Sequence, residues 1–152
     1  MKIAYVAGPY RAETTEGTLQ NIMRARACAV DLWSRGYGVI CPHANSALMS
    51  GVCPEENFLK AGLEMVKRSD MLVLLAEFIQ SHGAMKELQK AVYCKLPIYI
   101  WYQSTQKLYP QSIMQIRNVW VPFNTNTSQS IDRLRELYTP FVEDFLEKEK
   151  KS

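Results

Sequence analysis

The stretch SHGAMKELQKAV, residues 81–92, follows directly on the apolar run MLVLLAEFIQ and places a carboxylate close to a glycine. Helical spacing puts Glu87 on the flank of the apolar face that this stretch would bury, and not in its middle. Gly83 lies one turn earlier and leaves room for a ligand, while Ser81 is suited to cap a helix whose free N–H groups favour an anion. Two interpretations are open at this point: a solvated glutamate paired with Lys90, or a catalytic carboxylate beside a binding site.

Two further loops carry side chains suited to binding a ligand. The first loop follows a short β-rich run and contributes Gly8, Pro9, Tyr10 and Arg11. The guanidinium of Arg11 can hold a phosphate or carboxylate through two hydrogen bonds, although a surface arginine is the simpler interpretation of that residue alone. The second loop, CPHAN, contributes His43 and Asn45. A histidine without a second histidine or a carboxylate at ligand spacing does not predict a zinc site.

Several ligand classes are excluded by motifs that the chain lacks. It has no G-x-G-x-x-G for a dinucleotide and no G-x-x-x-x-G-K-S/T for a nucleoside triphosphate. The hydroxyl-rich ETTEGT, residues 13–18, is similar to a flavodoxin phosphate loop, but Glu13 and Glu16 would place negative charge against the phosphate. A phosphoacceptor receiver requires aspartates clustered at the strand ends, and this chain has none there. We therefore expect neither a cofactor nor a metal ion.

The order of the predicted elements indicates an α/β fold. Apolar and β-branched runs predict strands, and apolar residues at helical spacing predict helices. Strands are expected at residues 2–7, 37–41, 71–78 and 96–101, with a short fifth at 118–123, and helices at 18–35, 55–68, 82–94 and 128–147. This alternation favours a mostly parallel five-stranded sheet in a flavodoxin-like three-layer sandwich. The loops that contain Arg11, His43 and Glu87 would then lie at the carboxyl ends of the strands, where such sheets bind ligands. Residues 102–117 are compatible with loop or helix.

The composition is that of a single globular domain. The 152 residues are 47% hydrophobic with a net charge of +3, and scattered lysines and arginines argue against binding a nucleic-acid polymer. No signal peptide and no apolar run of membrane-spanning length is present, so no membrane contact is expected. The four cysteines lack C-x-x-C spacing and are expected as free thiols in a cytoplasmic protein. We expect one domain over residues 1–147 and a solvated tail at 148–152.

In combination, the motifs resemble the nucleoside 2-deoxyribosyltransferase superfamily. The resemblance covers residues 2–101 and rests on the order and spacing of YVAGPYR, AR in the next helix, PHAN, RSDMLVLL and S-x-G-x-x-x-E. It implies that Glu87 is a nucleophile that forms an ester with a 2-deoxy sugar, and that Tyr5 hydrogen-bonds this carboxylate. It also implies a nucleotide or nucleoside ligand and a homodimer or larger homo-oligomer. The aromatic residues of YIWYQSTQKLY would suit such an interface, or would cover the sheet.

The same resemblance distinguishes branches of the superfamily. Its 2'-deoxynucleoside 5'-phosphate N-hydrolases have a phosphate-binding serine six residues before the glutamate, and in this chain that residue is Ser81. Arg11 matches their phosphate-binding arginine, while Pro9 replaces the serine two residues before it. Ser112 matches a serine that a neighbouring subunit donates. The resemblance therefore favours hydrolysis of a nucleotide over transfer between nucleosides.

One position departs from the superfamily. Its members usually have an aspartate eight residues before the aspartate that opens the third strand, and this carboxyl assists protonation of the leaving base. Counting back from Asp70 gives Gly62. A missing general acid lowers a rate by about 10²- to 10⁴-fold. Three hypotheses therefore stay open: an N-glycosidase of (2'-deoxy)nucleoside 5'-monophosphates, a nucleoside 2-deoxyribosyltransferase, and a non-catalytic nucleotide-binding module.

Overall fold

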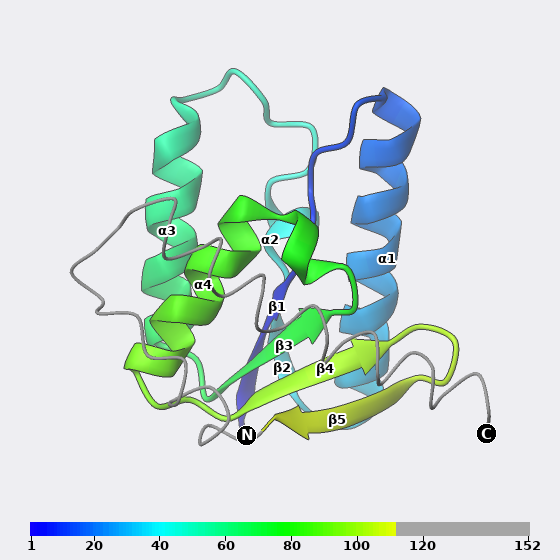
Figure 1. Ribbon diagram of the computed structural model, residues 1–152, viewed down its shortest axis with the longest axis vertical. Helices are drawn as coiled ribbons and strands as arrows, with labels where there is room; N and C mark the ends of the chain where they lie inside the picture. The colour runs from blue at the N-terminus through cyan, green and yellow to red at the C-terminus, as the bar shows by residue number, and fades with distance from the viewer. Residues whose placement is uncertain (112–152) are drawn as a thin grey trace.

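The computed structural model describes residues 1–111 of the chain. A five-stranded sheet in the order β2-β1-β3-β4-β5 forms its centre, with α1 on one face and α3 and α4 on the other (Figure 1). The strands are β1 (Ile3–Ala7), β2 (Gly38–Ile40), β3 (Met71–Leu75), β4 (Ile98–Tyr102) and β5 (Lys107–Gln111). The helices are α1 (Thr15–Ser34), α2 (Pro42–Asn45), α3 (Glu55–Lys67) and α4 (His82–Tyr93), and η1 (Phe78–Gln80) is a 3₁₀ turn. The expected flavodoxin-like α/β sandwich is confirmed.

The strand order changes direction at β1. This strand pairs in parallel with β2 on one side and with β3 on the other, so that Tyr5 lies between Ile40 and Leu72. β4 continues the sheet in parallel beside β3. The connections that follow β1 and β3 leave the same edge of the sheet in opposite directions, which opens a crevice between them.

Alternate residues of the central strands build two hydrophobic cores. Tyr5 and Leu72 pack with α3 and α4, whereas Val6 and Val73 pack with α1. β3 is buried along its whole length, as a continuous apolar run predicts for a strand covered on both faces. Tyr5 therefore points to the side of the sheet where α4 carries Glu87.

The helix ends follow caps that the sequence contains. The hydroxyl of Ser81 accepts a hydrogen bond from the N–H of Ala84 at 3.1 Å, which confirms the predicted N-cap of α4. α1 begins earlier than predicted because the hydroxyl of Thr14 accepts from the N–H of Gly17 at 3.0 Å. Gly36 has a φ of 87° just beyond the end of α1, the conformation expected of a terminating glycine.

The last strand differs from the sequence prediction. The predicted strand at 118–123 lies outside the described residues, as do the predicted helix 128–147 and tail 148–152. β5 instead forms within the segment 102–117 and runs antiparallel to β4. The turn that joins them is too short for a crossover helix, so an antiparallel hairpin is the arrangement available. β3 also ends earlier than predicted, because residues 78–80 form η1.

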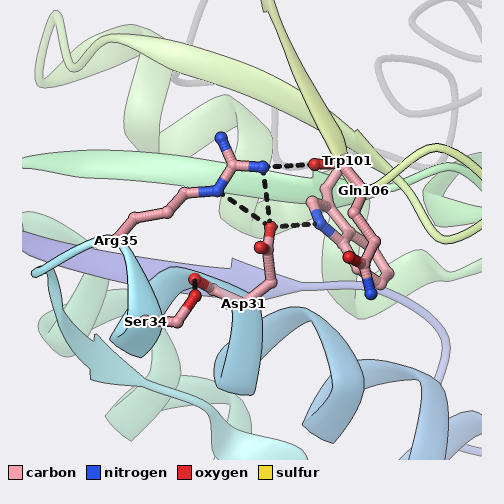
Figure 2. A network of polar contacts seen from close by, with 5 residues as sticks. All are labelled: Asp31, Ser34, Arg35, Trp101 and Gln106. Carbon is pink, nitrogen blue, oxygen red and sulfur yellow. Dashed lines mark hydrogen bonds and ion pairs between the residues drawn. The ribbon is translucent and has the colours of Figure 1, made fainter.

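A polar network fastens the β4–β5 hairpin to α1 (Figure 2). The carboxylate of Asp31 accepts a hydrogen bond from the indole Nε1 of Trp101 at 2.9 Å and pairs with the guanidinium of Arg35 at 3.0 Å. Arg35 also donates to the backbone carbonyl of Gln106 in the turn between the two strands. Trp101 and Tyr102 are both buried, so they cover the sheet, which is one of the two roles that the sequence left open for these aromatic residues.

Two general expectations concern the cysteines and the membrane. Within residues 1–111, no helix is long and apolar enough to cross a bilayer. All four cysteines are free thiols, as predicted, and Cys28 and Cys41 are buried. Burial raises the pKa of both buried thiols, which keeps them protonated and poorly nucleophilic.

Candidate active site at the carboxyl end of the sheet

A cavity of about 580 Å³ opens at the carboxyl ends of β1, β2 and β3. Its volume falls within the range of small-molecule sites, roughly 300–1,000 Å³. The loop after β1, the chain from α2 to the first turn of α3, and the start of α4 form its walls. The predicted site residues among its lining are Gly8, Pro9, Tyr10, Arg11, His43, Ser81, Gly83 and Glu87. The structure thus brings together residues from three loops that are far apart in the sequence.

Glu87 and Tyr5 form the central polar pair of this site. The Tyr5 hydroxyl donates a hydrogen bond of 2.6 Å to Oε1 of Glu87, which confirms the expected contact between the two residues. Burial raises the pKa of Glu87 to about 7, and the hydrogen bond from Tyr5 partly opposes this shift. Tyr5 is fully buried, and desolvation, followed by the adjacent carboxylate, raises its pKa above the usual value. Tyr5 is therefore a permanent hydrogen-bond donor, and Glu87 changes its charge near neutral pH.

Gly62 lies against this pair. A Cβ atom at this position would come within 2.9 Å of the Tyr5 hydroxyl oxygen and 3.0 Å of Oε1 of Glu87. Tyr5 is fully buried in the core, so a side chain at position 62 would press on its hydroxyl and on the carboxylate of Glu87. The glycine that the sequence resemblance singles out therefore lies directly beside the carboxylate of Glu87.

His43 holds the loop that follows β1. It is buried, and its Nε2 lies 2.9 Å from the carbonyl oxygen of Pro9, an acceptor that requires Nε2 to carry the proton. Burial, which outweighs the hydrogen bonds to the backbone, lowers the pKa of His43, so the ring is neutral at pH 7. The ring of Tyr10 lies against it at a centroid distance of 5.8 Å. Asn45, by contrast, is exposed and is not among the cavity-lining residues.

An ion pair crosses the mouth of the cavity. The guanidinium of Arg11 lies 3.1 Å from the carboxylate of Glu55, the first residue of α3, and both side chains are more than half exposed. Ser81, the cap of α4, lines the cavity close to the free N–H groups of the helix start. Ser112, the remaining predicted site residue, lies outside the described residues.

Several lining residues were not anticipated from the sequence. Phe58 and Leu59 of α3 and Met49 of the preceding loop contribute apolar wall, and Ser46 and Ser50 contribute hydroxyls. The signal that would have placed one face of α3 at the cavity is the recurrence of Glu55, Leu59 and Gly62 at positions i, i+4 and i+7.

Asn21 is a further residue that the sequence did not mark as part of the site. Its side-chain amide donates to the backbone carbonyls of Tyr10 and Arg11 at 3.2 Å and 3.4 Å, and so fixes the loop after β1 from the first turns of α1. No sequence pattern identifies this contact, because a lone asparagine in a helix is ordinarily solvated.

Comparison with protein families places residues 2–100 in the family described as "Domain of unknown function (DUF4406)". The chain belongs to this family. Among residues 1–111, the part matched to DUF4406 contains every residue that lines the cavity, together with Tyr5 and Gly62, whereas β5 lies beyond it. A search of curated proteins found no match. Within residues 1–111 of this DUF4406 chain, no group of three or more histidine, cysteine or acidic side chains is arranged to hold a metal ion.

Proposed function

We propose that the protein is an N-glycosidase that hydrolyses the base–sugar bond of a 2'-deoxynucleoside 5'-monophosphate, with Glu87 as the nucleophile. The observation that carries this proposal is a half-buried carboxylate in a ligand-sized cavity, fixed by a 2.6 Å hydrogen bond from a buried tyrosine. The resemblance to the nucleoside 2-deoxyribosyltransferase superfamily supports the same chemistry, because its nucleophile maps onto the same residue.

The reaction begins with the ionised carboxylate. With a pKa of about 7, roughly half of the Glu87 side chains carry a charge at neutral pH in the free protein. Oε1 is held by Tyr5 and closed off by α3 at Gly62, so Oε2 is the oxygen that would attack the anomeric carbon. The base departs as the sugar ester forms, and water then hydrolyses the ester to release deoxyribose 5-phosphate.

The mouth of the cavity supplies groups suited to a phosphate. Arg11 offers a guanidinium that can bind two phosphate oxygens, and the start of α4 offers backbone N–H groups beside the Ser81 hydroxyl. Both features line the same cavity as Glu87. A ligand phosphate would replace Glu55 as the partner of Arg11. The exposed Arg11–Glu55 ion pair contributes at most about 1 kcal/mol, so breaking it costs little.

The test incubates the protein with a panel of 2'-deoxynucleoside 5'-monophosphates and measures the released free base by chromatography. Glu87→Gln should abolish release, because an amide is not a nucleophile of comparable strength. Glu64→Gln is the matched control, since Glu64 is an exposed glutamate on α3 outside the cavity. Release that survives in Glu87→Gln, or no release by the wild-type protein from any nucleotide, contradicts the proposal.

A second candidate is a nucleotide-binding module without catalysis, and the observation that favours it is Gly62. The superfamily's proton donor is absent there, and the contacts of a Cβ at this position leave no room to restore one without moving Glu87. Calorimetric binding of nucleotides without any release of base would support this candidate. If an added acceptor base is converted to a new nucleotide, the protein is a transferase instead.

A further inference from the structure

Among residues 1–111, the floor of the cavity holds the carboxylate of Glu87 with no second carboxyl directly against it. Glu55, Leu59 and Gly62 share one face of α3. Gly62 is the most deeply buried of the three, and as a glycine it has no side chain. A Cβ there would meet the Tyr5 hydroxyl oxygen at 2.9 Å and Oε1 of Glu87 at 3.0 Å. No side chain therefore fits between α3 and the Tyr5–Glu87 pair while the two residues keep their 2.6 Å hydrogen bond.

The nearest titratable neighbours are already engaged. Tyr5 donates its proton to the carboxylate, and His43 is neutral with one ring nitrogen bound to a backbone carbonyl. Glu55 is paired with Arg11 at the mouth, seven residues and about 10 Å along α3 from Gly62. His82 lies in the first turn of α4, about 7–8 Å along the helix axis from the level of the nucleophile. Among residues 1–111, α3 therefore meets the Tyr5–Glu87 pair with Gly62 and with no acid side chain.

We propose that Gly62 determines which bases this site removes: with no acid side chain from residues 1–111 between α3 and the nucleophile, a base must leave as an anion that is stable by itself. This inference rests on the proposed function. As the bond between C1' and the base nitrogen breaks, its electron pair leaves with the base while Oε2 of Glu87 bonds to C1'. The departing anion takes a proton from water. Hydrolysis of the ester then adds water to C1', restores the carboxylate and returns a proton to solvent.

The chemistry of the bases then defines the substrate class. A pyrimidine with an electron-withdrawing substituent spreads the negative charge over its ring and carbonyl oxygens and leaves readily as an anion. A purine leaves well only after protonation of its imidazole ring, which calls for a donor. The expected substrates are therefore 5'-monophosphates of electron-poor pyrimidine 2'-deoxynucleosides, and purine nucleotides are expected to be poor substrates.

The experiment compares kcat/KM for 2'-deoxyuridine 5'-monophosphates that carry fluorine, bromine, hydrogen or methyl at position 5 of the base. Measurements at pH 7 give all four substrates the same ionised fraction of Glu87 and keep the N3 proton on most of each base. Bromine and methyl are similar in size but opposite in electronic effect, so this pair separates leaving-group ability from steric fit. The fluoro and bromo substrates should both exceed the methyl substrate, by on the order of tenfold or more, because no acid compensates for a poor leaving group.

Each outcome decides between the alternatives. A steep rise in rate with the acidity of the base, together with slow cleavage of purine nucleotides, supports the inference. Equal rates for the bromo and methyl substrates, or a purine nucleotide cleaved fastest, show that a donor assists departure and overturn it. If no nucleotide releases its base, the proposed function itself is refuted. This outcome differs from the ones that overturn only the inference about Gly62.

Discussion

Replacing Glu87 with glutamine is expected to stabilise the protein at neutral and alkaline pH. The carboxyl has a pKa of about 7 in the folded protein, against a usual value of 4.5, because burial disfavours its charged form. A difference of this size corresponds to about 3 kcal/mol, which is an upper limit for a side chain that is only half-buried. Glutamine keeps the shape and can still accept the hydrogen bond from Tyr5, so the substitution removes little besides the charge.

The sign of the effect changes with pH in a defined way. The folded protein keeps the proton on Glu87 up to about pH 7, whereas the unfolded chain loses it above about pH 4.5, so the wild-type free energy of unfolding falls as pH rises between these values. The advantage of Glu87→Gln should therefore be absent below about pH 4.5, grow through this interval and level off above pH 7. The titration of His43 affects both proteins equally and cancels in the difference.

Urea unfolding of both proteins at pH 4, 5.5 and 8 measures this difference. Glu64→Gln is the control, because it removes an exposed carboxylate from the same side of the sheet. If the free energies of unfolding of the wild-type protein and Glu87→Gln change in parallel with pH, the folded protein does not desolvate the carboxylate and the reasoning is refuted. A Glu87→Gln protein that is less stable than wild type at pH 8 would refute it as well.

Three further predictions concern other residues of the candidate site. Tyr5→Phe removes the hydrogen bond that lowers the pKa of the carboxyl, so the ascending limb of kcat/KM against pH should move above its wild-type midpoint near pH 7; an unchanged limb contradicts this role. Gly62→Ala should displace the carboxylate and reduce kcat on the order of 10²-fold, while better helix propensity offsets part of the strain by about 1 kcal/mol; wild-type turnover would show that the close contact is unimportant. Calorimetry with deoxyribose 5-phosphate should show binding weakened about tenfold or more by Arg11→Gln and strengthened up to about fivefold by Glu55→Gln. The effect of Glu55→Gln should vanish when Arg11 is also replaced, and an equal effect in both backgrounds contradicts competition for the guanidinium.

The fold was predictable wherever hydrophobic pattern and chain order act together. The apolar run of β3 and the alternation of strands and helices specify a mostly parallel sheet, and Ser81 and Gly36 mark helix ends that the structure confirms. β5 escaped prediction because KLYPQ is short and largely polar and contains Pro110, a residue that strands accept at an edge. Its turn also lacks a glycine, and Gln106 adopts a positive φ of 52° in its place.

The site was predictable in its location and in its central pair. Topology places the loops after β1, β2 and β3 at one edge of the sheet, and the superfamily resemblance anticipated the contact between Tyr5 and Glu87. Gly83 was expected to leave room for a ligand, but a Cβ there would also meet Leu59 at 3.3 Å, so the glycine serves the packing of α3 against α4 as well. The expected homo-oligomer and the nucleotide ligand stay predictions.

Contacts between segments far apart in the chain could not be predicted from the sequence. Arg11 and Glu55 are 44 residues apart, and nothing in their local patterns indicates that they pair across a cavity mouth. The fit of Gly62 against two oxygen atoms follows from the packing of α3 on β1 and α4, which a single sequence does not specify. The sequence marked this glycine only through a resemblance, and the structure shows that its missing side chain leaves room for the Tyr5–Glu87 pair.

Trapping of the sugar ester tests the central claim most directly. The protein is incubated with a nucleotide that it cleaves, quenched in acid during turnover, digested and mapped by mass spectrometry. The account predicts a deoxyribose 5-phosphate adduct on the peptide that contains Glu87, and no adduct in Glu87→Gln. Turnover that proceeds with an adduct on another residue, or that persists in Glu87→Gln without any adduct, would contradict it.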